Sequence, residues 1–299
     1  MNRLMNIIKN PWVLLYALFL RIGRFIPDKL YLSVLYRRIM RKRINWNNPK
    51  TFNEKLQWLK LNDRKPIYTT MVDKYEAKEY VSKIIGSEYI IPTIGVYNSF
   101  DEIDFSTLPN QFVIKCTHDS GGTYVCRDKS QIDINSIRRK INKSLKSNYY
   151  YNYREWPYKK VEPRIIIEEY IEDETGDIAD YKFSCFDGKA HNVMICYDRK
   201  SNDTKFYFFN RKWELLKYNK RGLSVPENFT IPKPKELNKM FDIAEKLSQS
   251  IPYVRIDLYN IKGRIYFGEI TFYPQSGFDS NLLEETDKLF GDLIKLDNI

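Results

Sequence analysis

The pattern of apolar and polar residues changes character once along the chain. Up to residue 85, apolar residues recur mainly at helical spacing, and the predicted helices cover residues 1–45, 51–61 and 71–85. Thr51 and Glu54 have the spacing of a capping box, so the second helix should begin at Thr51. A break in the first helix is expected near Pro27.

Strand-like alternation replaces the helical spacing from Gln111 onward. The predicted strands cover residues 112–116, 124–127, 165–171, 180–186, 190–197, 205–210, 253–259 and 265–272, and the helices between them cover 135–146 and 235–250. A short strand-like stretch at 89–97 precedes them, and the tyrosine-rich residues 148–158 predict no regular element. Turn sequences at Asp187-Gly188 and Lys262-Gly263 predict two hairpins, which indicates an α+β fold and not a doubly wound parallel sheet.

Length and composition are those of a folded protein. The chain has 299 residues, of which 43% are hydrophobic, and this is enough apolar material for one large domain or several lobes around a shared core. The change of pattern suggests a division into a basic amphipathic helical segment (1–45), an N-terminal helical and α+β region (46–110) and a core that carries the chemistry (111–299).

Positive charge is concentrated at the N-terminus. The formal net charge is +11, and residues 1–43 hold ten basic residues against the single acid Asp28. Because the rest of the chain is close to neutral, nucleic acid is not an expected partner. The apolar run at 12–20 is too short to span a bilayer, so the segment either lies on an anionic membrane surface or packs on the domain.

Cysteine and histidine are too few and too scattered for a zinc site. The four cysteines, Cys116, Cys126, Cys185 and Cys196, form no C-x-x-C pair, and each lies in a strand-like apolar setting. They are expected to be reduced and buried, which favours a cytoplasmic protein. Isolated histidines such as His118 are most often surface residues and receive no role.

A glycine-containing loop forms the first candidate site. Strand 112–116 places Lys115 on the face opposite Phe112 and Ile114, and Ser120, Gly121 and Gly122 follow in a polar loop. Adjacent glycines let backbone N–H groups approach phosphate oxygens, and Lys115 would add a positive charge. A plain β-hairpin with a surface lysine explains the same residues.

Two acidic strands form the second candidate site. Arg255 and Asp257 share one face of their strand, and Glu269 and Thr271 share one face of the next. A hairpin would bring Asp257 and Glu269 together, where like charges need a cation between them, and oxygen ligands suit Mg²⁺. Arg255 would stabilise a transferring phosphoryl group. The alternative is a cross-strand ladder of ion pairs.

A third candidate site joins two further strands. Glu168 and Glu169 close a buried strand, where a backbone edge is able to bind a purine, and Asp180, Lys182 and Ser184 share one face of the next strand. That spacing suits contacts to a ribose and to phosphate. A strand that ends in solvated acids is an equally good explanation.

Taken in order, these segments resemble the ATP-grasp superfamily. Four stretches at 112–122, 180–183, 255–259 and 267–274 carry the resemblance, which extends from about Thr51 to Leu296 and is strongest to the TupA-like group of teichuronopeptide and surface-polysaccharide biosynthesis. It implies two α+β lobes that clasp ATP. Most ATP-grasp enzymes have asparagine two residues after the metal-binding glutamate, whereas this chain has Thr271.

The resemblance also implies a role for each candidate residue. Phosphate contacts would come from Lys74, Lys115 and the loop Ser120-Gly121-Gly122; adenine and ribose contacts from Glu168, Glu169, Tyr170, Ile171 and Asp180; catalytic charge from Lys182, Arg199 and Arg255; and magnesium ligands from Asp257, Glu269 and Thr271. The implied cofactors are ATP and Mg²⁺.

The implied reaction is ATP-dependent activation of a carboxylate as an acyl phosphate, followed by attack of an amine. The partners would be ATP, a carboxylate-bearing sugar or amino acid, and an amine, with peripheral contact of residues 1–43 at the inner face of the membrane as a further expectation. A glycosyltransferase of capsule or surface-polysaccharide synthesis is the main rival, although no isolated D-x-D sequence supports it. A non-catalytic membrane- or RNA-binding protein is the second rival.

Overall fold

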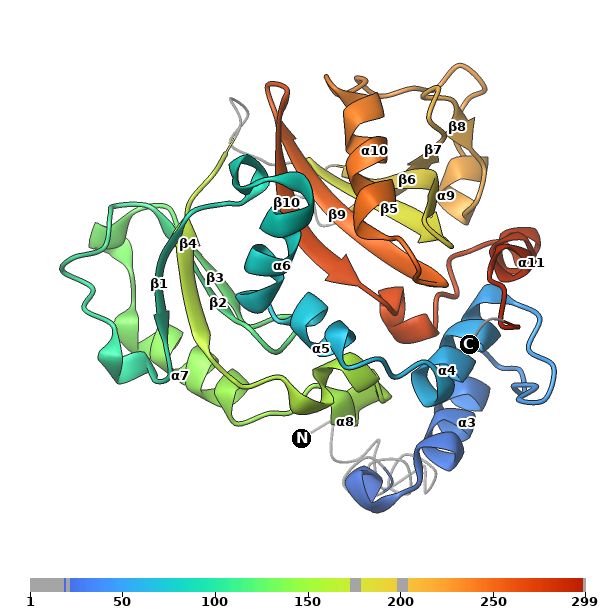
Figure 1. Cartoon of the computed structure of the whole chain (residues 1–299), viewed down its shortest axis with the longest axis horizontal. Coiled ribbons are helices and arrows are strands. Elements are labelled where there is room, and N and C mark those ends of the chain that lie inside the picture. The colour runs from blue at the N-terminus through green and yellow to red at the C-terminus, as the bar shows by residue number, and fades with distance from the viewer. Residues whose placement is uncertain (1–18, 20–21, 173–178, 198–203, 298–299) are drawn as a thin grey trace, which may run out of the picture.

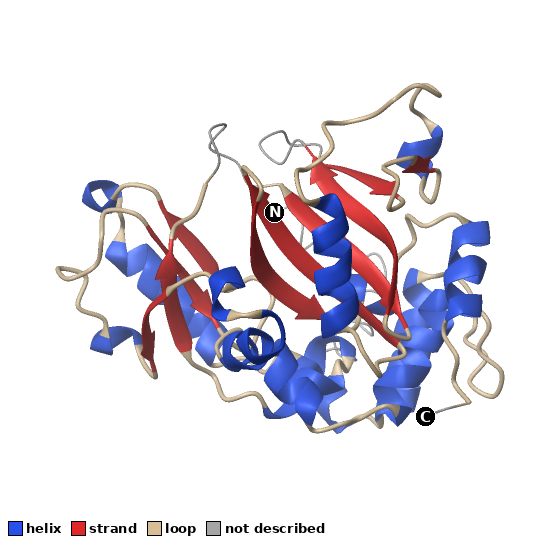
Figure 2. Cartoon of the chain, turned by 45° about the horizontal axis from the view of Figure 1, so that its top comes forward, coloured by secondary structure: helices blue, strands red, loops and turns tan. Residues whose placement is uncertain are grey.

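Two antiparallel β-sheets, each covered by a helix on its outer face, face one another across the molecule (Figures 1 and 2). The computed structural model describes residues 19, 22–172, 179–197 and 204–297. Within these ranges no helix is long and apolar enough to cross a bilayer. The antiparallel sheets, their hairpins and the helices that cover them confirm the predicted α+β class.

The smaller sheet has four strands in the order β1-β4-β2-β3. Its strands are β1 (Thr93–Tyr97), β4 (Ile165–Glu169), β2 (Phe112–Cys116) and β3 (Thr123–Cys126). Helix α7 (Ile134–Leu145) covers the outer face, where Ile137 and Ile141 pack with Phe112 and Ile114 in a closed apolar cluster. Lys115 therefore lies on the opposite, inner face, as its place in the strand predicts.

The larger sheet has six strands in the order β10-β9-β5-β6-β7-β8. Its strands are β5 (Asp180–Phe186), β6 (Lys189–Tyr197), β7 (Lys205–Phe209), β8 (Leu215–Leu216), β9 (Tyr253–Ile261) and β10 (Arg264–Thr271). Helix α10 (Leu237–Leu247) packs on the outer face, with the Phe241 ring edge-on to Phe183. Both predicted hairpins, β5–β6 and β9–β10, are present.

Shorter helices surround the two sheets. They are α3 (Asp28–Ile39), α4 (Phe52–Asn62), α5 (Ile67–Val72), α6 (Glu76–Ile85), α8 (Tyr150–Tyr153), α9 (Lys220–Leu223) and α11 (Glu284–Leu293), with 3-10 turns η1 (Gly23–Phe25), η2 (Ser87–Tyr89), η3 (Phe100–Glu102), η4 (Lys129–Gln131), η5 (Trp156–Lys160) and η6 (Pro274–Gly277). The predicted capping box of Thr51 and Glu54 opens α4.

Two of the predicted secondary-structure assignments are wrong. The single helix expected over 71–85 is divided into α5 and α6, because the Asp73 carboxylate accepts the N–H groups of Tyr75 and Glu76 and so starts a new helix. The tyrosine-rich stretch expected to lack regular structure holds α8 and η5. All four cysteines are free and buried, as expected.

Helix α3 is docked onto the body of the protein through Asp28. This carboxylate accepts hydrogen bonds from Arg64 at 2.9 Å and from the Tyr150 hydroxyl at 2.7 Å, and it pairs with Arg154 at 3.0 Å. Arg154 is almost fully buried and lies over the ring of Tyr31. The described part of the basic segment is thus tied to the fold, whereas most of the apolar run at 12–20 lies outside the described residues.

A β-bulge at Gly268 decides which face of β10 carries the acidic residue. The turn pairs Ile261 with Arg264, and continued regular pairing would place Gly268 opposite Asp257. The register shifts between Phe267 and Glu269 instead, so Glu269 takes that place and shares the face of Asp257. A two-residue hairpin without the bulge would turn Glu269 toward α10.

We predict that Gly268→Ala destabilises the protein. A Cβ at this position would lie 2.9 Å from the backbone oxygen of Asp257, and a backbone atom cannot turn aside. The expected loss is about 1–3 kcal/mol of unfolding free energy, measured by urea denaturation. Gly95→Ala, beside the register shift of β1, is the comparison variant, since the three atoms nearest its added Cβ all belong to the Tyr97 side chain, which is able to move. An equal loss in both variants would contradict a special role of the bulge.

Candidate functional site

The inner face of the larger sheet carries a row of charged residues. Lys182, Asp257 and Glu269 lie opposite one another on β5, β9 and β10. Arg255 occupies the neighbouring position and donates to Asp257 at 2.6 and 2.7 Å, to Glu269 at 3.2 Å and to Thr271 at 3.1 Å. The structure therefore brings together the two acids and the arginine that the sequence singles out.

Asp257 is the most enclosed member of this row. It is 1% exposed, and both of its oxygens accept hydrogen bonds from Arg255, while Lys182 donates to Oδ2. Burial alone would raise the pKa of Asp257, but Arg255 and Lys182 more than offset this and hold the pKa below its ordinary value. Asp180 also pairs with Lys182, at 2.6 Å, so one lysine serves two acids.

The donor atoms of this row fit a hard cation such as Mg²⁺. Asp257, Glu269 and Thr271 offer oxygen ligands only, and Glu269 is half exposed toward the cavity. In the described part of the chain no three His, Cys, Asp or Glu side chains come close enough to form a metal site alone. Further ligands would have to come from a phosphate-bearing substrate and water, and Arg255 would have to release an Asp257 oxygen.

The inner face of the smaller sheet carries an ion-pair cluster of its own. There the Glu168 carboxylate is 3% exposed and pairs with Lys115 at 2.5 Å and with Lys78 of α6. Burial would raise the pKa of Glu168, but the two lysines hold it below its ordinary value. Glu169 is exposed and faces away, so Glu168 is the acid on the inner side.

The predicted phosphate loop is shaped by its glycines. Gly121 has φ +131°, a value that favours glycine, and a Cβ there would meet nothing within 4 Å. Gly122 is buried, donates its N–H to Asp119 at 3.2 Å and has no room for a Cβ. Lys74 donates to the carbonyl oxygens of Cys116 and Asp119. Burial lowers the pKa of Lys74 and Lys115 lowers it further, whereas Asp119 and Glu269 raise it. The loop, Lys74 and the acidic row thus lie within electrostatic reach of one another.

An open cavity of about 720 Å³ lies beside the charged row of the larger sheet. Its lining comes from the loop (Ser120), from the tyrosine-rich segment (Tyr149, Tyr153, Glu155, Tyr158), from the larger sheet (Lys182, Cys196, Thr204, Phe206, Arg255, Glu269, Thr271) and from the turn after β10 (Tyr273, Pro274, Gln275, Ser276). Basic and acidic groups converge here from segments far apart in the sequence. This convergence marks the cavity as the candidate active site.

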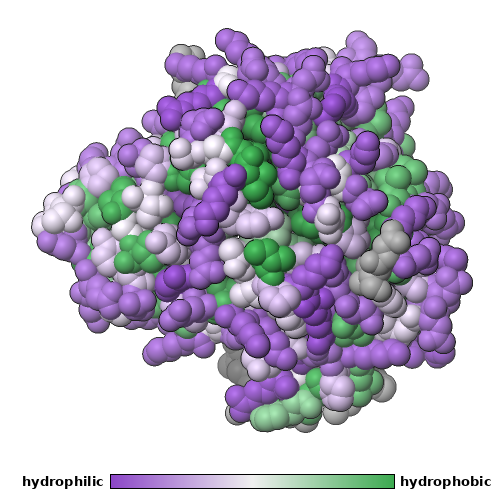
Figure 3. Space-filling model, in the orientation of Figure 1, coloured by the Kyte–Doolittle hydropathy of each residue, from purple (hydrophilic) through white to green (hydrophobic). Residues whose placement is uncertain are grey.

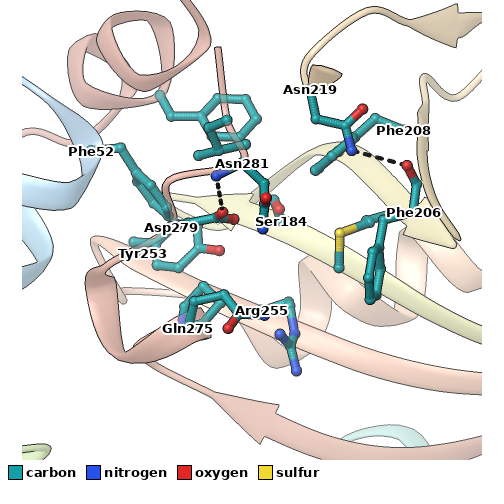
Figure 4. A pocket seen from close by; sticks show the side chains of 14 residues that line it. Phe52, Ser184, Phe206, Phe208, Asn219, Tyr253, Arg255, Gln275, Asp279 and Asn281 are labelled. Atoms are coloured by element: carbon teal, nitrogen blue, oxygen red, sulfur yellow. Dashed lines mark hydrogen bonds between the residues drawn. The ribbon is translucent and has the colours of Figure 1, made fainter. Parts of the chain in front are cut away.

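A smaller cavity of about 70 Å³ adjoins the first and shares Phe206, Arg255, Pro274 and Gln275 with it (Figure 4). Aromatic side chains make up much of its wall, and Ser184, Asn219, Asp279 and Asn281 supply polar groups. Asn219 donates to the carbonyl oxygen of Phe206 at 2.9 Å, and Asp279 accepts the N–H of Asn281 at 2.9 Å. The inner face of the sheet thus changes from charged to aromatic along its length.

The remaining predicted residues are placed as follows. Tyr170 and Ile171 continue from β4 and are partly buried, with the Tyr170 hydroxyl donating to Glu172 at 2.8 Å. Arg199 lies outside the described residues. The expectation of a surface position for His118 is wrong, because this ring is buried with Nε2 3.1 Å from the carbonyl oxygen of Ser144.

A buried polar cluster beside the larger cavity has no counterpart in the sequence prediction. Lys60 of α4 is fully buried and donates to the carbonyl oxygen of Ser276 at 2.7 Å and of Tyr153 at 2.9 Å. The Ser276 hydroxyl donates to Glu155 at 2.7 Å. A lysine within the apolar run of an amphipathic helix was the only local sign, and its partners lie about 90 and 220 residues away.

We predict that Glu168→Gln lowers stability at neutral pH by about 3 kcal/mol, because Lys115 and Lys78 lose their buried partner. Since the folded pKa of Glu168 lies below its ordinary 4.5, the stabilisation is present above that value and disappears as the pH falls through the folded pKa. Urea denaturation at pH 7 and pH 3 should therefore give a difference from wild type that shrinks in acid. The adjacent, exposed Glu169→Gln is the control; an equal effect there would refute the assignment.

Comparison with solved structures gives distant likenesses only. The chain is 16% identical to the D-alanine–D-alanine ligase of Bacillus anthracis (TM-score 0.42) and 15% identical to that of Helicobacter pylori (TM-score 0.43), covering 82% of this chain and 69% of each ligase. It is 9% identical to the ATP-grasp ligase PsnB, covering 81% of this chain and 66% of that one (TM-score 0.44). No curated protein matches the sequence significantly.

The family comparison is more extensive. The model of the TupA-like ATP-grasp family matches residues 54–295, which is most of the chain and contains both sheets and every candidate site residue. The predicted resemblance is thereby confirmed, and the chain belongs to the TupA-like ATP-grasp family.

Proposed function

We propose that the protein is an ATP- and Mg²⁺-dependent ligase that phosphorylates a carboxylate and transfers the resulting acyl group to an amine. One observation carries this proposal: Lys182, Arg255, Asp257 and Glu269 form a single charged patch, and the cavity beside this patch is also lined by Ser120 of the glycine loop. Phosphoryl transfer needs charge neutralisation and positioning, and no protein nucleophile.

Each charged group has a part in this reaction. Lys74, Lys115 and the Ser120-Gly122 loop hold the phosphates of ATP, and Glu168 to Ile171 with Asp180 hold the nucleoside. Mg²⁺, when bound by Asp257, Glu269 and Thr271, supplies charge stabilisation at the phosphates. Lys182 and Arg255 neutralise the phosphoryl group as it moves, and Arg199 is assigned to the same task.

The smaller cavity, which adjoins the larger one, would take part of a polar, ring-shaped acceptor whose remainder occupies the larger cavity. Its aromatic walls offer stacking faces, and the hydrogen-bonding groups of Ser184, Asn219 and Asn281 suit sugar hydroxyls. Because this cavity opens beside Arg255, a carboxylate held there would approach the phosphoryl group. We therefore favour a uronic acid or an amino acid linked to a glycan, and a role in cell-surface polysaccharide biosynthesis in the cytoplasm.

A glycosyltransferase is the second candidate function. Paired acids with a metal also bind nucleotide-sugars. A glycosyltransferase reaction, however, assigns no role to Lys74, Lys115 and the glycine loop. Incubation with ATP or with UDP-sugars separates the two, and product from a UDP-sugar without ATP would favour the transferase. ATP turnover by the full chain would exclude a purely membrane- or RNA-binding protein.

We predict that Asp257→Asn and Glu269→Gln each lower ADP formation at least a hundredfold, because the divalent ion loses a charged ligand. The measurement is coupled ADP release with ATP, Mg²⁺ and a panel of uronic and amino acids. Asp187→Asn makes the same chemical change in an exposed hairpin turn and should leave the rate unaltered. Undiminished turnover in both active-site variants would refute the metal assignment.

We further propose that α3 contacts an anionic membrane surface. Leu30 is 57% exposed and Val34 38% exposed on one side of this helix, Phe25 just before it is 75% exposed, and Arg37 is exposed one turn further on. Figure 3 shows apolar atoms at the lower edge of the molecule, where α3 begins in Figure 1. Apolar side chains beside basic ones suit the interface of an acidic bilayer.

Sedimentation with phospholipid vesicles tests this contact. We expect binding to vesicles rich in phosphatidylserine, little binding to phosphatidylcholine, and release by salt, because the attraction is partly electrostatic. Leu30→Glu should weaken binding at least tenfold, whereas Leu223→Glu, at an exposed site on α9, should not. Absence of binding to the acidic vesicles would reject the contact.

A further inference from the structure

Glu155 is a carboxylate buried at the edge of the candidate active site. It lines the larger cavity together with Arg255 and Glu269, yet its side chain is only 4% exposed. In the part of the chain that the structure describes, no basic side chain forms an ion pair with it. Lys60, which binds the same Ser276, lowers the pKa of Glu155 through space, but no cationic side chain among the described residues contacts the carboxylate directly. A buried acid that faces a substrate cavity without such a contact is costly unless it serves a ligand.

The position of Glu155 is fixed by an unusual turn. Gln275, Ser276 and Gly277 follow one another with φ of 49°, 52° and 67°, a left-handed run that two non-glycine residues rarely adopt. This backbone directs the Ser276 hydroxyl to Glu155 and its carbonyl oxygen to Lys60. Gln57 holds the same turn by donating to the Gly277 carbonyl oxygen at 2.6 Å.

Aromatic rings surround the carboxylate. Tyr149 and Tyr158 of the tyrosine-rich segment line the same cavity, and their rings lie edge to face with centroids 4.9 Å apart. Burial and the charge of Glu155 raise the pKa of Tyr149, whereas Ser120 of the loop and Ser276 lower it, so this tyrosine lies near the loop, the turn and the carboxylate. A carboxylate set among tyrosine rings is a recognition site for an organic ammonium ion.

We propose that Glu155 binds the ammonium group of the amine substrate and accepts the proton that this group must lose. The inference rests on the proposed ligase function and deepens it, since it names the class of the second substrate: a primary amine that arrives protonated. Ser276 and Lys60 act as positioning residues, because they hold Glu155 and do not face the reacting atoms.

The step balances as follows. Glu155 takes one proton from R′NH₃⁺, and the nitrogen lone pair then forms a bond to the carbonyl carbon of the acyl phosphate. The carbon–oxygen bond to phosphate breaks, and its electron pair leaves with the phosphate, which takes a second proton from nitrogen. The products are the amide, HPO₄²⁻ and one proton, which Glu155 releases to water.

The charges around Glu155 favour this task. Burial raises the pKa of Glu155, with a smaller contribution from Glu269, while Lys60, the Ser276 hydroxyl and Arg255 act in the opposite direction. Burial also lowers the pKa of Lys60 to about 7. A carboxyl group with a raised pKa is a better proton acceptor than an ordinary one, and a bound cation favours its ionised form.

Comparison of two nucleophiles tests the proposal. Hydroxylamine is largely unprotonated at neutral pH, so it traps an acyl phosphate as a hydroxamate without a protein base, whereas ammonium, ethanolamine and amino acids require one. Full-length protein with ATP, Mg²⁺ and the panel of uronic and amino acids is assayed with each. We expect E155Q to lower amide formation at least tenfold more than hydroxamate formation, and E162Q, at an exposed site, to alter neither.

A second variant tests the role of Glu155 independently, in case the E155Q protein does not fold. S276A keeps the carboxylate and removes its hydrogen-bond donor, which should raise the pKa of Glu155 further. The acidic limb of the pH profile for amide formation should then move to higher pH, while the hydroxamate profile stays in place. An unmoved amide profile would overturn the assignment.

The other outcomes are equally decisive. No hydroxamate from wild-type protein with any carboxylate would overturn the proposed ligase function itself. Hydroxamate without amide from any protonated amine would exclude the ammonium site while leaving carboxylate activation intact. Equal losses of both products in a folded E155Q protein, or no loss of either, would show that Glu155 has a structural role only.

Discussion

The site depends on the neutralisation of Asp257. A carboxylate buried to this extent is unstable without compensating charge, and here Arg255 reaches it along the same strand while Lys182 reaches it from the next. These contacts fix the register of β5, β9 and β10 where their inner faces meet the cavity. They also hold the cationic groups where a phosphoryl group would need them.

Neutralisation of a buried acid by basic side chains also occurs on the smaller sheet. Glu168 holds Lys115 and Lys78, so two lysines are fixed on the inner side of the smaller sheet without an excess of unpaired charge in the free protein. On each sheet an acid keeps basic side chains in place. A nucleotide triphosphate and its metal ion would exchange with these internal partners, and this keeps the cost of binding low because the side chains are already ordered.

Two backbone irregularities, one at a glycine and one in a left-handed turn, set the directions of the Glu269 and Ser276 side chains. The bulge at Gly268 turns Glu269 inward, and the run Gln275–Gly277 directs Ser276 to Glu155 a few residues later. The bulge lies within β10, and the left-handed turn follows the end of that strand. Local strain in the turn is maintained by α4, whose Gln57 and Lys60 donate hydrogen bonds to its carbonyl oxygens.

The sequence by itself determined the family, the α+β class and the residues of the charged row, because strand alternation is a local property that can be read from neighbouring residues. The meeting of Asp257 and Glu269 on one face was predicted, yet it holds only through a bulge that a simple hairpin lacks. Only the tertiary structure decided that Glu168, and not Glu169, lies on the inner face and pairs with Lys115, and that Lys60 and Glu155 share a serine. These contacts join residues that are far apart in the sequence. Such contacts produce no local periodicity from which they could be predicted.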